Sequence, residues 1–260
     1  MRKITVILFV ALLATPIGKA MAWGQEGHRI VGQVSYNHLT KKAKKNVDKV
    51  LGRHGIVYCS TWADEIKSDT IYPTSYDWHF QDLDGGLSDE AVVRTLTLYP
   101  AMGGNLWRMS DSLTNVLRRE PDNVDALRFV IHLMGDRFCP MHTAHLEDLG
   151  GNKVKLKWFG EQRNLHWVWD EGIISARGYS YSEYAEYLEN HLAGEIKKIQ
   201  EMTIEEITLH NYHFCESVYQ YQDHWDGNAY HYVYHFAADC EWQLYAAGIR
   251  LAMVLNEIYG

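Results

Sequence analysis

Two short blocks of histidine and aspartate between residues 132 and 170 constrain this chain more than any other feature. In the first block, His132 and Asp136 stand four residues apart within an apolar run. Residues four apart on a helix project from one face, one turn apart, so the pair can hold one cation. In the second block, His166 and Asp170 repeat this spacing. The two pairs predict two helices that present metal ligands.

One further ligand-type residue lies between these blocks. Pro140 ends the first helix, because proline lacks an amide hydrogen and its ring clashes with the preceding turn. The chain can then return His142 toward the same site. A single His-x-x-x-Asp pair is about as often a buried histidine bonded to a nearby carboxylate as a metal site. Two such pairs together with His142 favour the metal site.

The first 22 residues have the composition of a secretory signal peptide. Arg2 and Lys3 precede an apolar run over residues 4–13, and residues 20–22 form a small-x-small cleavage site. The run is too short to span a bilayer, and no later segment has about twenty consecutive apolar residues. We therefore expect a mature protein that starts at Trp23, has no membrane insertion and is periplasmic or secreted.

The mature chain is predicted to be acidic. Removal of residues 1–22 takes away three of the 25 Lys and Arg residues, so 22 stand against 33 Asp and Glu, a net charge of −11. This sign argues against tight non-specific binding of a polyanion through a basic surface. A nucleic acid can still be the substrate if bound cations supply positive charge at the site.

Helical patterns dominate the rest of the chain. We predict helices near residues 30–39, 41–51, from 62, from 89, and over 105–119, 123–138, 182–200, 203–222 and 229–258. Residues 70–86 have loop composition, and residues 154–158 alternate with period two, which indicates a small hairpin. The fold class is therefore predicted to be all-α, a single compact helical domain over residues 23–260 with a minor β-hairpin.

Four cysteines remain after cleavage, and an oxidising compartment permits two disulfides with three possible connectivities. We predict a disulfide between Cys215 and Cys240. They lie on either side of residues 226–228, a turn-type triplet that should separate two helices. If these helices form an antiparallel hairpin, residues equidistant from the turn face each other. The alternative is that both cysteines are buried free thiols, which behave as small apolar residues.

The candidate metal ligands share imidazole, carboxylate or terminal-amine chemistry. In order they are the Trp23 terminus, His28, Asp64, His79, His132, Asp136, His142, His166 and Asp170. Such ligands without thiolate suit zinc in a hydrolytic site. Nine ligand residues exceed what one zinc ion needs, so we predict a cluster. A carboxylate such as Asp136 can bridge two ions about 3.5 to 4 Å apart.

Five motifs carry a resemblance to a known family. They are W-G-x-x-G-H at residues 23–28, W-A-D at 62–64, W-H-F at 78–80, H-x-x-x-D-x-x-x-P-x-H at 132–142, and G-G-N followed by N-L-H-x-x-W-D, which ends at 170. In this order they make the chain resemble the zinc-dependent single-strand-specific nucleases, the S-one/P-one or class I nucleases. The resemblance implies a helical domain of the zinc phospholipase C / nuclease type.

The resemblance implies three zinc ions. One would be held by Asp64, His79, His132 and Asp136, a second by His142, His166 and Asp170, and a third by the amino and carbonyl groups of Trp23, His28 and the bridging Asp136. It also gives catalytic roles to Asp64, Asp136 and Lys67.

The same resemblance assigns substrate contacts. Phe80 would stack on a base, Asp82 would hydrogen-bond its edge, and Lys67 would lie near the scissile phosphate. The chain departs from the family at two positions. Lys67 stands where members commonly have Arg, which gives a point charge instead of a bidentate fork. Cys139 stands where many members have Gln.

The implied activity is hydrolysis of single-stranded DNA and RNA, as endonuclease and 3′-nucleotidase, to 5′-phosphorylated products by a zinc-activated hydroxide. Single-stranded nucleic acid and 3′-nucleotides would be the substrates, and we expect a monomer. Stacking on Phe80 requires an unstacked base, which favours single strands.

Two other functions fit parts of this pattern. Zinc phospholipase C shares the N-terminal Trp and the His/Asp pattern but typically closes its last ligand pair with Glu, whereas this chain has Asp170. A zinc storage protein would tend to use His-rich tracts. The ligands here are dispersed and surround a loop with Phe80 and Asp82, which favours a nuclease.

Overall fold

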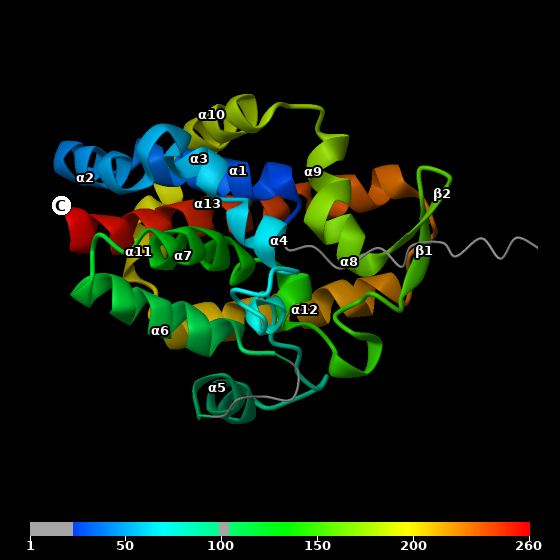
Figure 1. The fold of residues 1–260 in the computed structure, drawn as a ribbon. Helices are drawn as coiled ribbons and strands as arrows, with labels where there is room; N and C mark the ends of the chain where they lie inside the picture. The colour runs from blue at the N-terminus through cyan, green and yellow to red at the C-terminus, as the bar shows by residue number, and fades with distance from the viewer. Residues whose placement is uncertain (1–22, 99–103) are drawn as a thin grey trace, which may run out of the picture.

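The longest helix, α13 (Ala229–Tyr259), runs through the middle of the protein. In the computed structural model, which describes residues 23–98 and 104–260, helices α1, α2, α3 and α10 lie on one side of it, and α6, α7 and α12 lie on the other (Figure 1). The core surrounds this helix, because most of its second half is buried. The predicted signal peptide over residues 1–22 lies outside the described residues. The all-α prediction is confirmed.

Helix α1 (Gln25–Asn37) packs closely against α13. A Cβ atom added at Gly248 would lie 2.5 Å from Cγ1 of Val34, so only glycine permits this distance between the helices. Helix α2 (Lys41–Leu51) begins as predicted, because the Thr40 side chain accepts a hydrogen bond from the Ala43 amide. The residue that caps its C-terminal end is Gly52, whose φ of 65° is a conformation that favours glycine. A short 3₁₀ turn, η1 (Gly52–His54), follows.

Two short helices, α3 (Gly55–Cys59) and α4 (Trp62–Ile66), lead into the predicted loop. The loop contains a 3₁₀ turn, η2 (Ser75–Trp78), and is held by two isolated bridges, Gln81 with Gly104 and Leu83 with His145. Helix α5 (Asp89–Leu98) starts at the predicted residue. The loop therefore depends on partners that are distant in sequence.

Helices α6 (Leu106–Arg119) and α7 (Val124–Asp136) pack against each other. The Asn123 side chain caps α7 by accepting a hydrogen bond from the Ala126 amide. Helix α7 ends at Asp136, two residues before the predicted end, and the 3₁₀ turns η3 (Pro140–Thr143) and η4 (Leu146–Asp148) follow.

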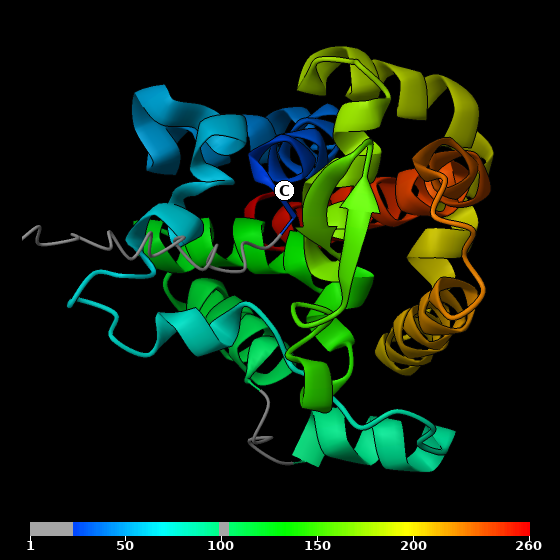
Figure 2. The ribbon, with the colours of Figure 1, turned by 90° about the vertical axis from the view of Figure 1, so that its right-hand side faces the viewer.

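The predicted hairpin is the only sheet within the described residues. Strand β1 (Lys155–Trp158) pairs antiparallel with β2 (Glu161–Asn164), and the register places Lys155 opposite Asn164. The hairpin stands at one end of the molecule and faces the viewer in Figure 2. It leads into α8 (Leu165–Trp167), a π-helical turn η5 (Val168–Gly172), and α9 (Ile173–Ala176).

The predicted helix over residues 182–200 is interrupted. It forms α10 (Tyr181–Leu192) and α11 (Ile196–Glu201), separated by the 3₁₀ turn η6 (Ala193–Glu195). Gly194 lies in this turn, where its low helix propensity favours the break. Helix α12 (Ile204–Gln222) starts as predicted, with a capping box between Thr203 and Glu206. No described helix is both long enough and apolar enough to cross a membrane.

The prediction of a Cys215–Cys240 disulfide is wrong, since all four cysteines are buried free thiols. Helices α12 and α13 do turn back on each other, but aromatic rings such as Phe236 fill the space between them. Cys215 interacts electrostatically with Asp82, whereas Cys240 interacts with Tyr184 of α10. The two thiols thus face different neighbours, and a disulfide needs Cα atoms within about 7 Å.

Candidate metal centre

The predicted ligands lie on separate segments between α1 and η5, and these segments meet around one buried site. Helix α1 supplies His28, α4 supplies Asp64, the residue after η2 is His79, α7 supplies His132 and Asp136, η3 supplies His142, α8 supplies His166, and η5 supplies Asp170. All of these side chains are buried. The structure therefore brings together in one place the eight ligand side chains that the sequence singles out.

Asp136 lies at the centre of the first cluster. Its Oδ1 is 3.2 Å from Nε2 of His28, and its Oδ2 is 3.2 Å from Nδ1 of His79 and 3.3 Å from Nε2 of His132. Oδ1 of Asp64 lies 3.8 Å from the same nitrogens of His79 and His132. Three imidazoles around one carboxylate, with a second carboxylate beside them, are a donor set suited to zinc.

Asp170 organises a second cluster. Its Oδ2 is 3.0 Å from Nε2 of His166, and its Oδ1 is 3.6 Å from Nε2 of His142. The two clusters are adjacent, because Nδ1 of His142 is also 3.8 Å from Oδ1 of Asp136. One continuous buried site thus contains both clusters.

Backbone carbonyl groups orient three of these imidazoles. Nδ1 of His132 donates to the Ser60 carbonyl at 2.6 Å, and Nδ1 of His166 donates to the Gly150 carbonyl at 2.6 Å. Nδ1 of His142 donates to the carbonyl of His79. These bonds hold a proton on Nδ1, so Nε2 is the atom that faces the carboxylates and can bind a metal once it has lost its own proton.

Two glycines permit the close approach of ligands. A Cβ atom at Gly135 would lie 2.9 Å from Nδ1 of His28, so glycine at this position allows α1 to bring His28 against α7. Gly150 has a φ of 63°, and a Cβ there would lie 2.9 Å from the Met141 carbonyl oxygen. A side chain at either position would displace a ligand or its backbone support.

Many polar atoms in this site lie at ion-pair distance from one another but form no hydrogen bond of correct geometry. They include both oxygens of Asp136, Oδ2 of Asp64, both nitrogens of His28, and the Nε2 atoms of His79, His142 and His166. Buried polar groups without partners cost several kcal/mol unless something else satisfies them. A cluster of cations would satisfy these atoms, so the donor set fits metal ions.

The pKa shifts of the metal-free protein also favour a metal site. Burial opposes ionisation of Asp136, but the neighbouring His132, His28 and His79 hold the pKa of its carboxyl well below its usual value. Burial lowers the pKa of His28 to about 4, whereas Asp136 and Asp64 overcome burial and raise the pKa of His132 to about 9. A cation that binds near neutral pH therefore meets an ionised carboxylate and displaces a proton from His132.

Three groups of side chains place their ligand atoms within 4.8 Å of one another: His28 with His132 and Asp136, Asp64 with His79 and His132, and Cys139 with His142 and Asp170. The third group contains Cys139 in place of His166, which the sequence did not suggest. Sγ of Cys139 donates to Oδ1 of Asp170 at 3.3 Å. Burial and then Asp170 raise the pKa of this thiol well above its usual value, so Cys139 acts as a neutral donor to Asp170.

The segment that begins at Trp23 lies beside both clusters. The amide of Gly24 donates to the Asp170 carbonyl at 2.8 Å, and the Trp23 side chain is fully buried. Cδ1 of the Trp23 indole would lie 3.7 Å from a Cβ atom at Gly135, next to Asp136. The role of the Trp23 amine as a ligand stays a prediction, because it depends on cleavage after residue 22.

The predicted substrate residues surround these ligands. Nζ of Lys67 is 3.1 Å from Oδ1 of Asp64. Phe80 directly follows His79 and is partly exposed, with its ring 5.6 Å from that of Tyr76. Asp82 is buried, Oδ1 has no hydrogen-bond partner, and burial raises the pKa of its carboxyl to about 7.

Comparison with known proteins identifies the family. The family described as S1/P1 Nuclease matches residues 23–260. This chain belongs to that family. It is 25% identical to Endonuclease 3 of Arabidopsis thaliana over 97% of this chain and 94% of the relative. It is 29% identical to Nuclease S1 of Aspergillus oryzae over 62% of this chain and 58% of the relative. With Nuclease P1 of Penicillium citrinum it shares 27% identity over 57% of each chain.

The resemblance inferred from the five motifs is therefore confirmed. As a member of the S1/P1 family the chain is a nuclease, and the matched region includes both histidine and aspartate clusters. The match also extends to residue 260, so the C-terminal helices that carry no motif of their own belong to the same family domain.

Proposed function

We propose that this S1/P1 nuclease is a zinc-dependent phosphodiesterase that hydrolyses single-stranded DNA and RNA and 3′-nucleotides to 5′-phosphorylated products. The observation that carries this proposal is the buried site around Asp136 and Asp170, where carboxylate and imidazole atoms face one another without hydrogen-bond partners. Imidazole and carboxylate ligands suit zinc.

Three zinc ions would have separate ligand sets. Asp64, His79, His132 and Asp136 would hold one, His142, His166 and Asp170 the second, and Trp23, His28 and Asp136 the third. The shared position of Asp136 is supported by its two oxygens, since Oδ1 faces His28 and Oδ2 faces His79 and His132. Bound zinc would supply Lewis acidity toward a phosphate and lower the pKa of a water molecule, as hydrolysis at neutral pH requires.

The side chains of the protein itself would position the substrate. Lys67 now pairs with Asp64 and can turn its ammonium group toward a phosphate that enters beside the first cluster. Phe80 offers a partly exposed ring next to His79, on which an unpaired base can stack. Asp82 has a carboxylate oxygen without a partner, which can accept a hydrogen bond from a base edge. Duplex bases are already stacked, so this arrangement favours single strands.

The proposal also covers the mature N-terminus, the location and the oligomeric state of the enzyme. We infer that residues 1–22 are a signal peptide and that the mature enzyme begins at Trp23, acts in the periplasm or outside the cell, and is a monomer. Cleavage there would place a free amine beside Asp136, where the Trp23 side chain already lies. An α-amine has a pKa of about 7.7, low enough for a metal to displace its proton near neutrality.

One assay series tests the function. The purified zinc-loaded protein is compared on denatured DNA, RNA, 3′-AMP and a phosphatidylcholine analogue. We expect cleavage of the first three and 5′-phosphate ends on the products. The Asp136→Asn variant should lose activity, while Asp226→Asn, on an exposed turn, should retain it. Cleavage of the phosphatidylcholine analogue alone would show a phospholipase, and zinc binding without any cleavage would show a storage protein.

A further inference from the structure

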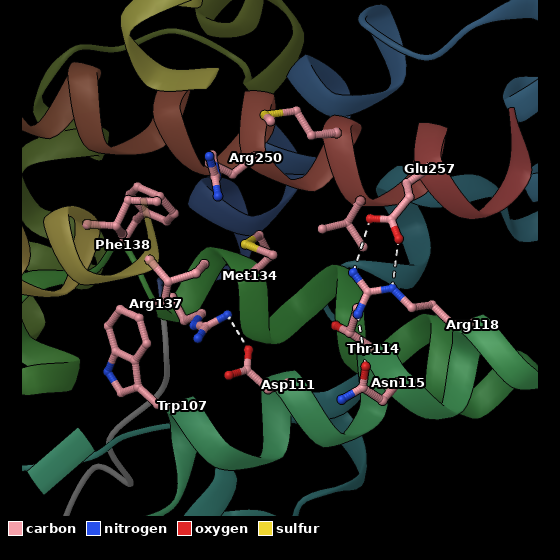
Figure 3. A pocket seen from close by; sticks show the side chains of 14 residues that line it. Trp107, Asp111, Thr114, Asn115, Arg118, Met134, Arg137, Phe138, Arg250 and Glu257 are labelled. Carbon is pink, nitrogen blue, oxygen red and sulfur yellow. Dashed lines mark hydrogen bonds and ion pairs between the residues drawn. The ribbon is translucent and has the colours of Figure 1, made fainter. Parts of the chain in front are cut away.

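Apart from the metal centre, the structure has a cavity at the C-terminal end of α7, on a different face of the helix from His132 and Asp136. It has a volume of about 580 Å³ and is enclosed by α6, α12, α13 and the end of α7 (Figure 3). His132 and Asp136 point into the metal centre, whereas Met134, Arg137 and Phe138 line this cavity. Small-molecule sites have volumes of about 300–1,000 Å³. No predicted ligand or substrate residue lines the cavity, so the nuclease reaction does not account for it.

Arg137 is a buried charge at this cavity, with only 4% of its surface exposed. Its Nη1 donates to Oδ1 of Asp111 at 2.9 Å, and its guanidinium lies 4.3 Å from the centre of the Trp107 ring. Its Nε and Nη2 atoms are buried and have no hydrogen-bond partner. Leaving buried charged donors unpaired is costly. Figure 3 shows Arg137 in the lining of the cavity, beside Trp107 and Asp111.

A second arginine reaches the cavity from α13. Nη1 of Arg250 donates to three backbone carbonyls near the end of α11, at 2.9 to 3.3 Å. Within the described residues, no carboxylate forms an ion pair with it. Burial, and then the positive charge of Arg137, lower the pKa of Arg250. Arg137 and Arg250 line the same cavity, and an anion between them would interact favourably with both charges.

A third arginine in the lining is already neutralised. Nε and Nη2 of Arg118 donate to the two carboxylate oxygens of Glu257 at 2.8 and 3.0 Å, and Nη1 donates to Asn115. The lining thus contains three arginines and two carboxylates, Asp111 and Glu257. Asp111 pairs with Arg137 and Glu257 pairs with Arg118, so the positive charge left over among the lining residues is that of Arg250, although the whole chain is acidic.

We propose that this cavity binds an organic anion that has one carboxylate or phosphate head and an apolar body. The head would lie between Arg137 and Arg250 and would balance their positive charge. The body would lie against Met134, Met253 and Val254, which are apolar and line the same space. The site is separate from the metal centre and does not require the proposed nuclease activity.

Binding of four probes to the zinc-loaded protein tests this proposal by titration calorimetry. Decanoate and decyl phosphate have both a charged head and an apolar body, decanol lacks the charge, and inorganic phosphate lacks the body. We expect saturable binding of at least one decyl anion and at least tenfold weaker binding of decanol and of inorganic phosphate. The tighter of the two decyl anions identifies the head group.

Matched variants locate the binding. Arg250→Gln should weaken binding of the decyl anion about tenfold or more, because it removes a charged hydrogen bond. Arg118→Gln makes the same change of charge at an arginine that Glu257 already neutralises, and should alter binding by less than about twofold. Val254→Trp should abolish binding by filling the cavity, and circular dichroism should show that it is folded.

Several outcomes would overturn the proposal. These are the absence of saturable binding of both decyl anions, equal weakening by Arg118→Gln and Arg250→Gln, and binding that Val254→Trp leaves unchanged. Inorganic phosphate that binds as tightly as decyl phosphate, with binding that Val254→Trp removes and that therefore lies in this cavity and not at the metal centre, would also overturn it, because the apolar wall would then contribute nothing. If Arg250→Gln fails to fold, the proposal is tested by comparing the binding of the decyl anions to Val254→Trp and to the wild type.

Discussion

At the scale of single residues, Asp136 and Asp170 make the same i, i+4 pair with a histidine but have different surroundings. Asp136 faces His28, His79 and His132 with its two oxygens, so it can serve two ions. Asp170 faces the second cluster only. Helix α7 packs against α1 and α4, which carry His28 and Asp64, whereas η5 packs against η3, which carries His142.

We therefore predict that Asp136→Ala loses more than one zinc ion per protein, while Asp170→Ala loses mainly one. The reason is that a carboxylate shared by two ions removes a ligand from each when it is deleted. Metal analysis of the two purified variants by mass spectrometry measures this directly. Loss of a single ion from both would show that Asp136 is not shared.

Phe80 supplies the second prediction at this scale. Phe80→Ala should retain zinc and should weaken binding of a single-stranded oligonucleotide by about 1 to 3 kcal/mol, the contribution of one base stack. Phe159→Ala, at an exposed ring on the hairpin, is the control and should leave this affinity unchanged. If Phe80→Ala instead loses metal, Phe80 supports His79 structurally and does not contact the base.

At the scale of helices, the contact between α1 and α13 positions His28. The third prediction is that Gly248→Ala lowers the free energy of unfolding by about 1 to 3 kcal/mol, the usual cost of overpacking. The added Cβ would lie 2.5 Å from Val34, so α1 must move. Gly194→Ala is the control, since a Cβ there would have no neighbour within 4 Å. Denaturant unfolding measures both, and equal stabilities would show that the contact relaxes freely.

The end of α1 is also fixed by a carboxylate on α10. Oε2 of Glu189 accepts hydrogen bonds from Nε2 of His38 at 2.8 Å and from the Tyr245 hydroxyl at 3.1 Å. Partial burial opposes ionisation, but the bonds from His38, Asn37 and Tyr245 lower the pKa of Glu189. A lowered pKa means that the ionised group stabilises the fold above the pKa of the unfolded chain, and that this contribution disappears as the pH falls.

The fourth prediction follows from this direction of the pH dependence. Glu189→Gln should lower the free energy of unfolding by about 1 kcal/mol at pH 7, and the difference from the wild type should shrink below about pH 4. Chemical unfolding of the metal-free proteins at pH 7 and pH 3.5 measures the difference. Glu201→Gln, in an exposed pair with Lys197, is the control. A difference that stays constant with pH would rule out an ionised Glu189 as the cause.

At the scale of the whole molecule, the sequence predicts local features better than long-range ones. The helices and the two i, i+4 ligand pairs follow from spacing and capping residues such as Thr40 and Asn123. His28 and His79 are candidates by residue type, but only the family resemblance assigns them to the same site as the two pairs, because packing and bridges between distant segments bring them there. The Cys215–Cys240 disulfide failed for the same reason, since symmetry about a turn does not reveal the rings between two helices.

The cavity at the C-terminal end of α7 shows this limit most clearly. Arg137 and Arg250 are far apart in the sequence; Arg137 occupies a variable position of the motif at residues 132–142, and Arg250 lies in no motif. Arg137 directly follows a predicted ligand, but only the packing of α6, α7 and α13 shows that it turns away from the metal centre. A lone arginine in a helical pattern is indistinguishable from a solvated surface residue.

The metal centre joins α1, α4, α7, α8 and the loop after η2, so metal binding should stabilise the whole fold. The fifth prediction is that chelation lowers the melting temperature of the wild type, because a ligand at a thousand times its dissociation constant stabilises the folded state by about 4 kcal/mol. Asp136→Asn should show a smaller decrease on chelation, since it holds less metal to lose. Differential scanning calorimetry with and without chelator, followed by zinc addition, measures the effect and its reversal. A wild-type melting temperature that chelation leaves unchanged, after metal analysis shows that zinc has been removed, would mean that the packing around α13 holds the centre together without metal.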